Sequence, residues 1–169
     1  FWSFSTEVDI DSSKNNRNPS APHNLLFTHA EILNNPNGIA SDEPIVLDLT
    51  IKVNKYVPDF YVGLVIRDAS SGIRVVSSYT DPIKTPEKDM FTVRVEYKNH
   101  NLFGGKYIIQ LELLNKHDLG ENVIDQIYNV LLFNVAYKTF ANKEPLIVEW
   151  PDMGFIFNYG SQYLSIEEL

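Results

Sequence analysis

The sequence of 169 residues contains no cysteine. Disulfide frameworks, thiol catalysis and zinc–thiolate sites are therefore excluded, and the redox compartment cannot be read from cysteine usage. No apolar run approaches the ~20 residues needed to cross a bilayer. A chain of this length can bury about 70% of its extended-chain surface in one domain, so it needs neither a disulfide nor a metal to hold its fold together.

Positive charge is also scarce. The chain has 14 Lys and Arg against 22 Asp and Glu, which gives a formal net charge of −8. The basic residues are scattered along the sequence, and an acidic surface repels phosphate backbones, so nucleic acid is disfavoured as a partner. The same charge argues against docking on anionic membrane surfaces. A neutral ligand or another protein remains open as a partner.

The motifs of several enzyme classes are missing as well. Gly105-Lys106 has the form of the end of a phosphate-binding loop, but His100 stands where that loop needs Gly and Tyr107 where it needs Ser or Thr. No GxSxG nucleophile elbow occurs. The four histidines lie in or beside predicted loops, where an isolated histidine is usually solvated, without the spacing of a metal site: His23, His29, His100 and His117. We predict no catalytic residue, no metal ligand and no cofactor.

The clearest positive signal is a β-hairpin over residues 59–82. Val62, Leu64 and Ile66 alternate with residues of the opposite face, which is typical of a strand with one face buried. Residues 68–72 (DASSG) form a turn, and the β-rich composition resumes over residues 73–80. Gly63 lies inside the first strand, where glycine weakens the ladder unless a bulge or a close backbone approach requires it.

Similar strand signals recur along the chain, and helical periodicity is nowhere convincing. We expect strands within residues 1–10, 25–33, 45–53, 91–97, 107–114, 123–137, 145–150 and 154–166. About eight to eleven short strands with turns between them indicate an all-β sandwich, jelly roll or barrel. We divide the chain into residues 1–24, an N-terminal strand and polar linker, and residues 25–169, the β-sandwich. The chain opens without Met or a basic signal-peptide region, which we interpret as a fragment of a longer protein.

Aromatic and amide side chains point to sugar as a ligand. The sequence has 10 Phe, 9 Tyr and 2 Trp, and although most must fill the core, the remainder can serve as platforms for the apolar face of a sugar ring. Amide, carboxylate and guanidinium groups suit its hydroxyl rim. Strand parity predicts an outward-facing, carbohydrate-binding set: Tyr61, Arg67, Gln110, Glu112, Tyr128 and Asn134. A bulge between residues 123 and 137 would reverse the last two.

Several short motifs occur in a characteristic order: Val62-Gly63, Ile66-Arg67-Asp68, Gly72, Tyr79-Thr80, Leu102 with Gly105 and Tyr107, and Phe133-Asn134-Val135. In order and spacing, roughly residues 25 to 137 resemble the C-terminal carbohydrate-binding domain of Wzt, the ATPase subunit of ATP-binding-cassette exporters for lipopolysaccharide O-antigen. The resemblance implies a jelly-roll-like β-sandwich of two antiparallel sheets, and a homodimer in which terminal strands, here within residues 139–169, are exchanged.

The resemblance further implies a function. The domain would recognise the non-reducing end of a finished O-polysaccharide and couple that recognition to export, in the cytoplasm at the inner membrane. Its partners would be the glycan, a separate ATPase domain and a membrane-spanning transporter subunit. Two alternatives stay open: a structural or dimerisation sandwich without ligand, and a jelly-roll sugar-nucleotide enzyme. The enzyme would need two acid/base groups in one pocket and turnover that depends on a His or Glu. Glu96 and Glu112 on outward strand faces would be the carboxylate pair of a glycoside hydrolase, although an outward Glu on a strand ordinarily serves solubility.

Overall fold

The computed structural model describes residues 7–10, 16–115, 122–136 and 164–168. The described residues form the strands β1 (Glu7–Asp9), β2 (Leu25–Ile32), β3 (Ile45–Val53), β4 (Asp59–Asp68), β5 (Arg74–Tyr79), β6 (Ile83–Lys84), β7 (Met90–Tyr97), β8 (Gly105–Leu114), β9 (Val123–Val135) and β10 (Leu164–Glu168). Among these residues no helix has the length and apolar character needed to span a membrane.

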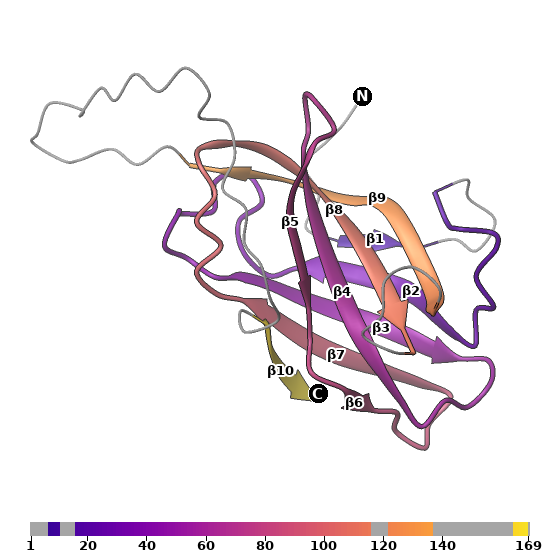
Figure 1. The fold of residues 1–169 in the computed structure, drawn as a ribbon. Coiled ribbons are helices and arrows are strands. Elements are labelled where there is room, and N and C mark those ends of the chain that lie inside the picture. Colours follow the sequence, from indigo (N-terminus) through magenta and orange to yellow (C-terminus); the bar gives the residue numbers. More distant parts are fainter. Residues whose placement is uncertain (1–6, 11–15, 116–121, 137–163, 169) are drawn as a thin grey trace, which may run out of the picture.

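The strands form two sheets that stack face to face (Figure 1). The first sheet has the order β1-β2-β3-β7-β10. The second has the order β5-β4-β8-β9, and the short β6 pairs with the start of β4. Neighbouring strands are antiparallel throughout both sheets. The predicted all-β, jelly-roll-like sandwich is therefore confirmed.

The core lies between the sheets and follows the alternation seen in the sequence. In β3 the residues Ile45, Leu47, Leu49 and Ile51 are buried, while the residues between them are half-buried. The same period of two brings alternate residues of β4, β7 and β8 into one apolar cluster. Each buried Leu, Ile or Phe side chain stabilises the fold by roughly 1.5–3 kcal/mol relative to an exposed one.

The predicted hairpin is present as β4 and β5. The turn between them is organised by Asp68, whose carboxylate accepts hydrogen bonds from the hydroxyls of Ser70 and Ser71 and from the Ser71 amide. Slight burial acts to raise the pKa of Asp68, but these hydrogen bonds prevail and hold it below its ordinary value. Gly72 has a φ of 71°, a conformation that glycine adopts without the strain that a Cβ would add.

β9 is an edge strand of the second sheet, and two loop segments cover its outer edge. Near its start, the Asn18 amide donates to the Gln126 carbonyl and the Tyr128 amide donates to the Asn16 carbonyl. Near its end, Ile39 forms an isolated parallel bridge with Val135. Such cover satisfies backbone groups that would otherwise be free to pair with another chain. Part of the segment expected to be a linker thus packs against the sandwich.

A buried ion pair holds that segment in place. Arg17 is 6% exposed and Asp125 is 0% exposed, and the Arg17 Nη1 donates to the Asp125 carboxylate. The Arg17 Nη2 also donates to the Phe27 carbonyl at 2.7 Å. The same carboxylate accepts the Phe27 backbone amide at 2.9 Å, which ties β9 to β2 in the opposite sheet. At this end of the sandwich, the ion pair and its hydrogen bonds therefore join the two sheets in addition to apolar packing.

The last part of the chain is described only over residues 164–168. There β10 pairs with β7 of the same chain, from Leu164 opposite Tyr97 to Glu168 opposite Val93. The predicted strand over residues 145–150, and most of the one over residues 154–166, lie outside the described residues. The exchange of terminal strands between two chains stays a prediction.

Candidate functional site

The candidate site lies on the outer face of the second sheet, which is the face turned away from the core. Residues of this face alternate with core residues along β4, β8 and β9. Its apolar members are buried but do not belong to the core cluster: Val65, Ile108, Leu114 and Leu132. The accessible part of the outer face therefore consists mainly of its polar and aromatic positions.

Five side chains form a continuous hydrogen-bonded row on the outer face, which we call the polar ladder: Arg67, Gln110, Glu112, Gln126 and Tyr128. The Arg67 Nε and Nη2 both point at the Gln110 Oε1, at 3.4 Å. The Gln110 Nε2 donates to the Glu112 Oε1 at 2.9 Å. The Gln126 Nε2 donates to the same oxygen at 2.8 Å, and the Tyr128 hydroxyl donates to the Gln126 Oε1 at 2.8 Å.

The ladder has a buried middle and accessible ends. Gln110 is 2% exposed and Glu112 is 7% exposed, whereas Tyr128 is 39% exposed. Arg67 and Gln126 are half-buried. A buried carboxylate is costly unless it is hydrogen-bonded, and the two amide groups supply those bonds. We therefore assign Gln110 and Glu112 to holding the orientation of the groups at the ends.

The other two residues of the predicted set lie apart from the ladder. Tyr61 is on the outer face near the start of β4, opposite Leu114, and is half-buried. Asn134 lies near the opposite end of β9, where its Nδ2 donates to the Asn37 carbonyl at 3.0 Å. The structure thus brings together four of the six predicted residues, while Asn134 secures a loop. Whether the set binds a glycan stays a prediction.

β9 has two register shifts against β8, a one-residue shift at its start between Val123 and Asp125 and a larger bulge between Ile127 and Leu131, and the larger bulge does not reverse the faces. Ile109 pairs with Leu131 and Leu111 pairs with Ile127, so three residues of β9 face one residue of β8. Two extra residues are an even number, and the alternation is therefore the same on both sides. The bulge is accommodated by Asn129, whose φ is 54°. Tyr128 and Asn134 consequently keep their outward orientation.

Sequence reasoning missed two residues of the outer face, Tyr79 and Gln126. Tyr79 lies opposite Gly63, and a Cβ on Gly63 would be 2.9 Å from the Tyr79 Cε1 and 3.2 Å from the Glu112 Cβ. The close approach that a glycine inside a strand indicates is thus made by the Tyr79 ring. Gln126 had no comparable signal, because its place depends on the register between β8 and β9.

The prediction that the histidines are solvated loop residues is wrong for two of the three that the structure describes, and His117 lies outside the described residues. His100 is 0% exposed. Its Nδ1 accepts the Leu102 amide at 3.0 Å, and its Nε2 lies 3.3 Å from the Ala40 carbonyl. Burial lowers the pKa of His100, because the charged imidazolium loses its hydration. This residue joins two loops in its neutral form.

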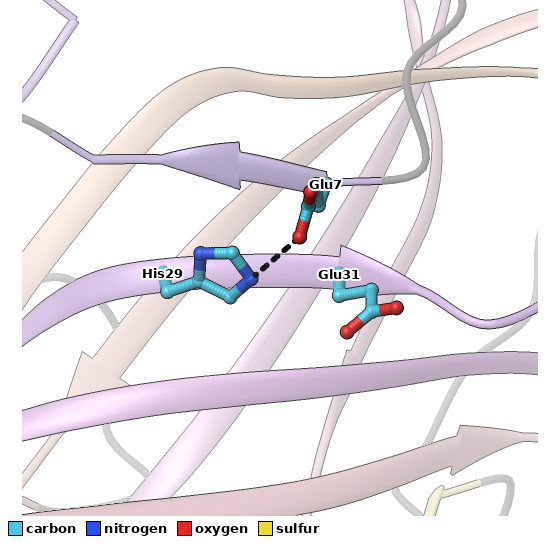
Figure 2. A group of neighbouring side chains, drawn as sticks. All are labelled: Glu7, His29 and Glu31. Atoms are coloured by element: carbon cyan, nitrogen blue, oxygen red, sulfur yellow. Dashed lines mark ion pairs between the residues drawn. The ribbon is translucent and has the colours of Figure 1, made fainter.

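His29 is the second exception, since it lies within β2 in a group of side chains with metal-ligand chemistry (Figure 2). One ligand atom from each of Glu7, His29 and Glu31 lies within 4.8 Å of the others. The His29 Nε2 is 3.5 Å from a Glu7 oxygen, and its Nδ1 is 2.8 Å from the Asp9 Oδ1. Glu7 and Asp9 of β1 are the register partners of Glu31 and His29 of β2, so the His29 ring is within reach of carboxylates on the neighbouring strand. These ion pairs account for the group, and we assign no metal to it.

Comparison with known proteins identifies the family. The sequence matches the family model of the Wzt C-terminal domain over residues 22–145. A solved structure described as the crystal structure of the C-terminal domain of wzt is similar in fold, with a TM-score of 0.58 and 10% identity over 73% of this chain and 78% of that chain. At that identity the similarity concerns the fold alone.

A match to the solved structure of a β-glucosidase from Listeria innocua in complex with glucose covers 67% of this chain and 16% of that chain, with 14% identity and a TM-score of 0.41. No curated protein matches the sequence. The family model covers well over half of the chain, so the family predicted from the motifs is confirmed. The chain belongs to the Wzt C-terminal domain family.

Proposed function

We propose that this chain is a non-catalytic carbohydrate-binding domain that recognises the non-reducing end of an O-antigen polysaccharide. The family is known in general as the O-antigen-binding domain of the Wzt ABC transporter ATPase. The observation that carries the proposal for this chain is the polar ladder, which runs without a break from Arg67 to Tyr128. An extended row of fixed donors and acceptors is of little use to the core, from which it faces away.

The chemistry of the ladder suits sugar hydroxyls. A hydroxyl both donates and accepts, so it can pair with guanidinium, amide and phenol groups. The buried middle of the ladder holds the half-buried Arg67 and Gln126 in defined orientations, which lowers the entropy lost on binding. We expect a dissociation constant on the order of mM to μM for one glycan end, about −4 to −8 kcal/mol. In a homodimer, two binding sites that are occupied together would raise the apparent affinity.

The rest of the proposal concerns coupling. Binding of the finished glycan end would be transmitted to an ATPase domain and to a membrane-spanning transporter subunit, so the domain would act in the cytoplasm at the inner membrane. The support is the family alone. The acidic charge of −8 fits a partner that is neither nucleic acid nor an anionic membrane surface.

Calorimetric titration of the domain tests this function. The ligands are O-polysaccharide from the source of the chain, with its non-reducing end intact, and the same material with that end removed. We expect binding of the intact form and a loss of about tenfold to a hundredfold in Arg67→Ala, because a hydrogen bond to a charged group is lost. Lys52→Ala is the control, since it removes an exposed cation from the first sheet.

Each other outcome contradicts the proposal in its own way. Equal binding of the intact and shortened glycan would show that the end is not recognised. A dimer that binds neither glycan would favour a structural sandwich. Turnover of a sugar nucleotide, abolished by Glu112→Gln, would favour the enzyme.

A further inference from the structure

Gly63 is explained by a neighbouring ring and not by its own backbone. It lies in the middle of β4, and it is not among the glycines with positive φ. A Cβ at this position would lie 2.9 Å from the Tyr79 Cε1 and 3.1 Å from the Tyr79 Cδ1. Real Cβ atoms do not approach other atoms so closely, and a glycine inside a strand often marks such a close approach. The Tyr79 ring therefore leans over β4 and fills the space of the missing side chain.

The ring is placed beside the polar ladder. Gly63 is the register partner of Tyr79 on one side and of Glu112 on the other, and Glu112 is the partner of Gln126. One row across four strands thus consists of the aromatic Tyr79, the glycine Gly63 that its ring covers, the carboxylate of Glu112 and the amide of Gln126. Two strand spacings, about 10 Å, separate the backbones at Tyr79 and Glu112. That span is comparable to one hexose residue with its substituents.

Tyr61 is a second aromatic group next to this row. It is two residues from Gly63 on the same face, so it is a diagonal neighbour of Tyr79. Diagonal neighbours in a sheet are within reach of aromatic side chains. Both tyrosines are half-buried, so each keeps part of its surface accessible to a ligand.

We propose that Tyr79, held over Gly63, is the apolar platform of the outer face, on which the C–H face of a neutral pyranose residue stacks. This inference rests on the proposed function and specifies its ligand. The ring supplies the apolar contact, and Gln126 and Tyr128, which lie farther along the outer face on β9, supply polar contacts to the hydroxyls of the ligand. The nearest charged group in this row is Glu112, so a sugar carboxylate at this position would meet a like charge.

Four variants test the platform, each titrated with the intact O-polysaccharide and checked for folding by its amide NMR spectrum and unfolding midpoint. Tyr79→Phe keeps the ring, and we expect binding within about twofold of the parent. Tyr79→Leu removes the ring, and we expect binding weaker by about fivefold to tenfold. Gly63→Ala displaces the ring without removing it and should weaken binding similarly. Gly38→Ala is the matched control, because a Cβ there meets nothing within 4 Å.

A saturation-transfer NMR measurement adds a direct readout. Ring C–H protons of one neutral sugar residue should receive magnetisation in the parent and in Tyr79→Phe, and should lose it in Tyr79→Leu. If the parent binds but Tyr79→Leu and Gly63→Ala bind equally well, the platform is refuted while the proposed function stands. If the parent binds no O-polysaccharide, both are refuted.

Discussion

The buried ion pair between Arg17 and Asp125 gives the sharpest stability prediction. The perturbation is Arg17→Met, which keeps much of the side-chain volume and removes the charge. Asp125 would then keep the Phe27 amide at 2.9 Å and the amide of Gln126 at 3.0 Å, with His23 at 3.7 Å, but it would lose its guanidinium partner. The carboxylate is 0% exposed and cannot recover that loss from water.

The expected cost follows from that geometry. Removing one partner of a buried pair destabilises proteins by about 3–5 kcal/mol, because a charge is left without compensation. The remaining hydrogen bonds to Asp125 place the expectation near the lower end, at about 3 kcal/mol. The Arg17 Nε, which has no hydrogen-bond partner among the described residues, reduces what the pair contributes in the first place. For a domain of this size, about 3 kcal/mol corresponds to a fall in Tm of roughly 6–12 °C.

Urea unfolding at pH 7 measures this, in a cycle with Asp125→Asn and the double variant. The double variant leaves no buried charge. We therefore expect its loss of unfolding free energy to be smaller than the sum of the two single losses by about 1–3 kcal/mol. Arg74→Met is the control at an exposed position and should stay within about 0.5 kcal/mol of the parent. A cost below about 1 kcal/mol for Arg17→Met, or additive single changes, would show that water reaches the pair and would refute the reasoning.

Three further predictions concern other parts of the fold. His100 has a lowered pKa, so below its ordinary value of 6.5 the unfolded chain gains a proton that the folded chain resists. Stability should therefore fall as pH drops from 7.5 to 5.5, by at most about 1.4 kcal/mol per pH unit; a His100→Gln variant with an identical urea-midpoint profile would contradict this. Leu111→Ala, at a core position with 0% exposure, should cost about 2–5 kcal/mol in urea unfolding, and a cost as small as that of Ile73→Ala at the exposed hairpin tip would mean that the sheets are loosely packed. Gly72→Ala should cost about 1–2 kcal/mol because of its φ of 71°, whereas Gly38→Ala should be neutral or slightly stabilising; equal midpoints for the two would argue against the left-handed turn.

Much of the fold could be predicted because the pattern is local. In β3 and β7, apolar residues occupy every second position, and the register places Leu47 opposite Val95 and Leu49 opposite Val93. The hairpin was equally accessible, since turn residues separate two such runs. By contrast, β6 is only two residues long, and pairing with β4 is all that defines it. Its two residues carry no periodicity, so no pattern could indicate it.

The sequence could predict on which face of the sheet the site residues lie, but not how deeply their side chains are buried. Parity placed Gln110 and Glu112 on the outer face, yet their burial depends on neighbours from other strands, which alternation does not describe. His100 was misjudged for the same reason, because its partner Ala40 is distant in sequence. Gly63 did indicate a close approach within β4, but the group that makes it, Tyr79, follows only from the register between β4 and β5.

The larger bulge in β9 determines how many residues can be inserted or deleted in this strand. Because it holds two surplus residues, a second pair could be added or the present pair removed, and Leu131 and Phe133 would still face the core. Deleting a single residue there would move every later side chain of the strand to the opposite face of the sheet. Phe133 would then face the solvent, and Asn134 would face the apolar core. Homologous chains should therefore differ at this point by even steps, and a one-residue deletion should abolish folding while its two-residue counterpart is tolerated.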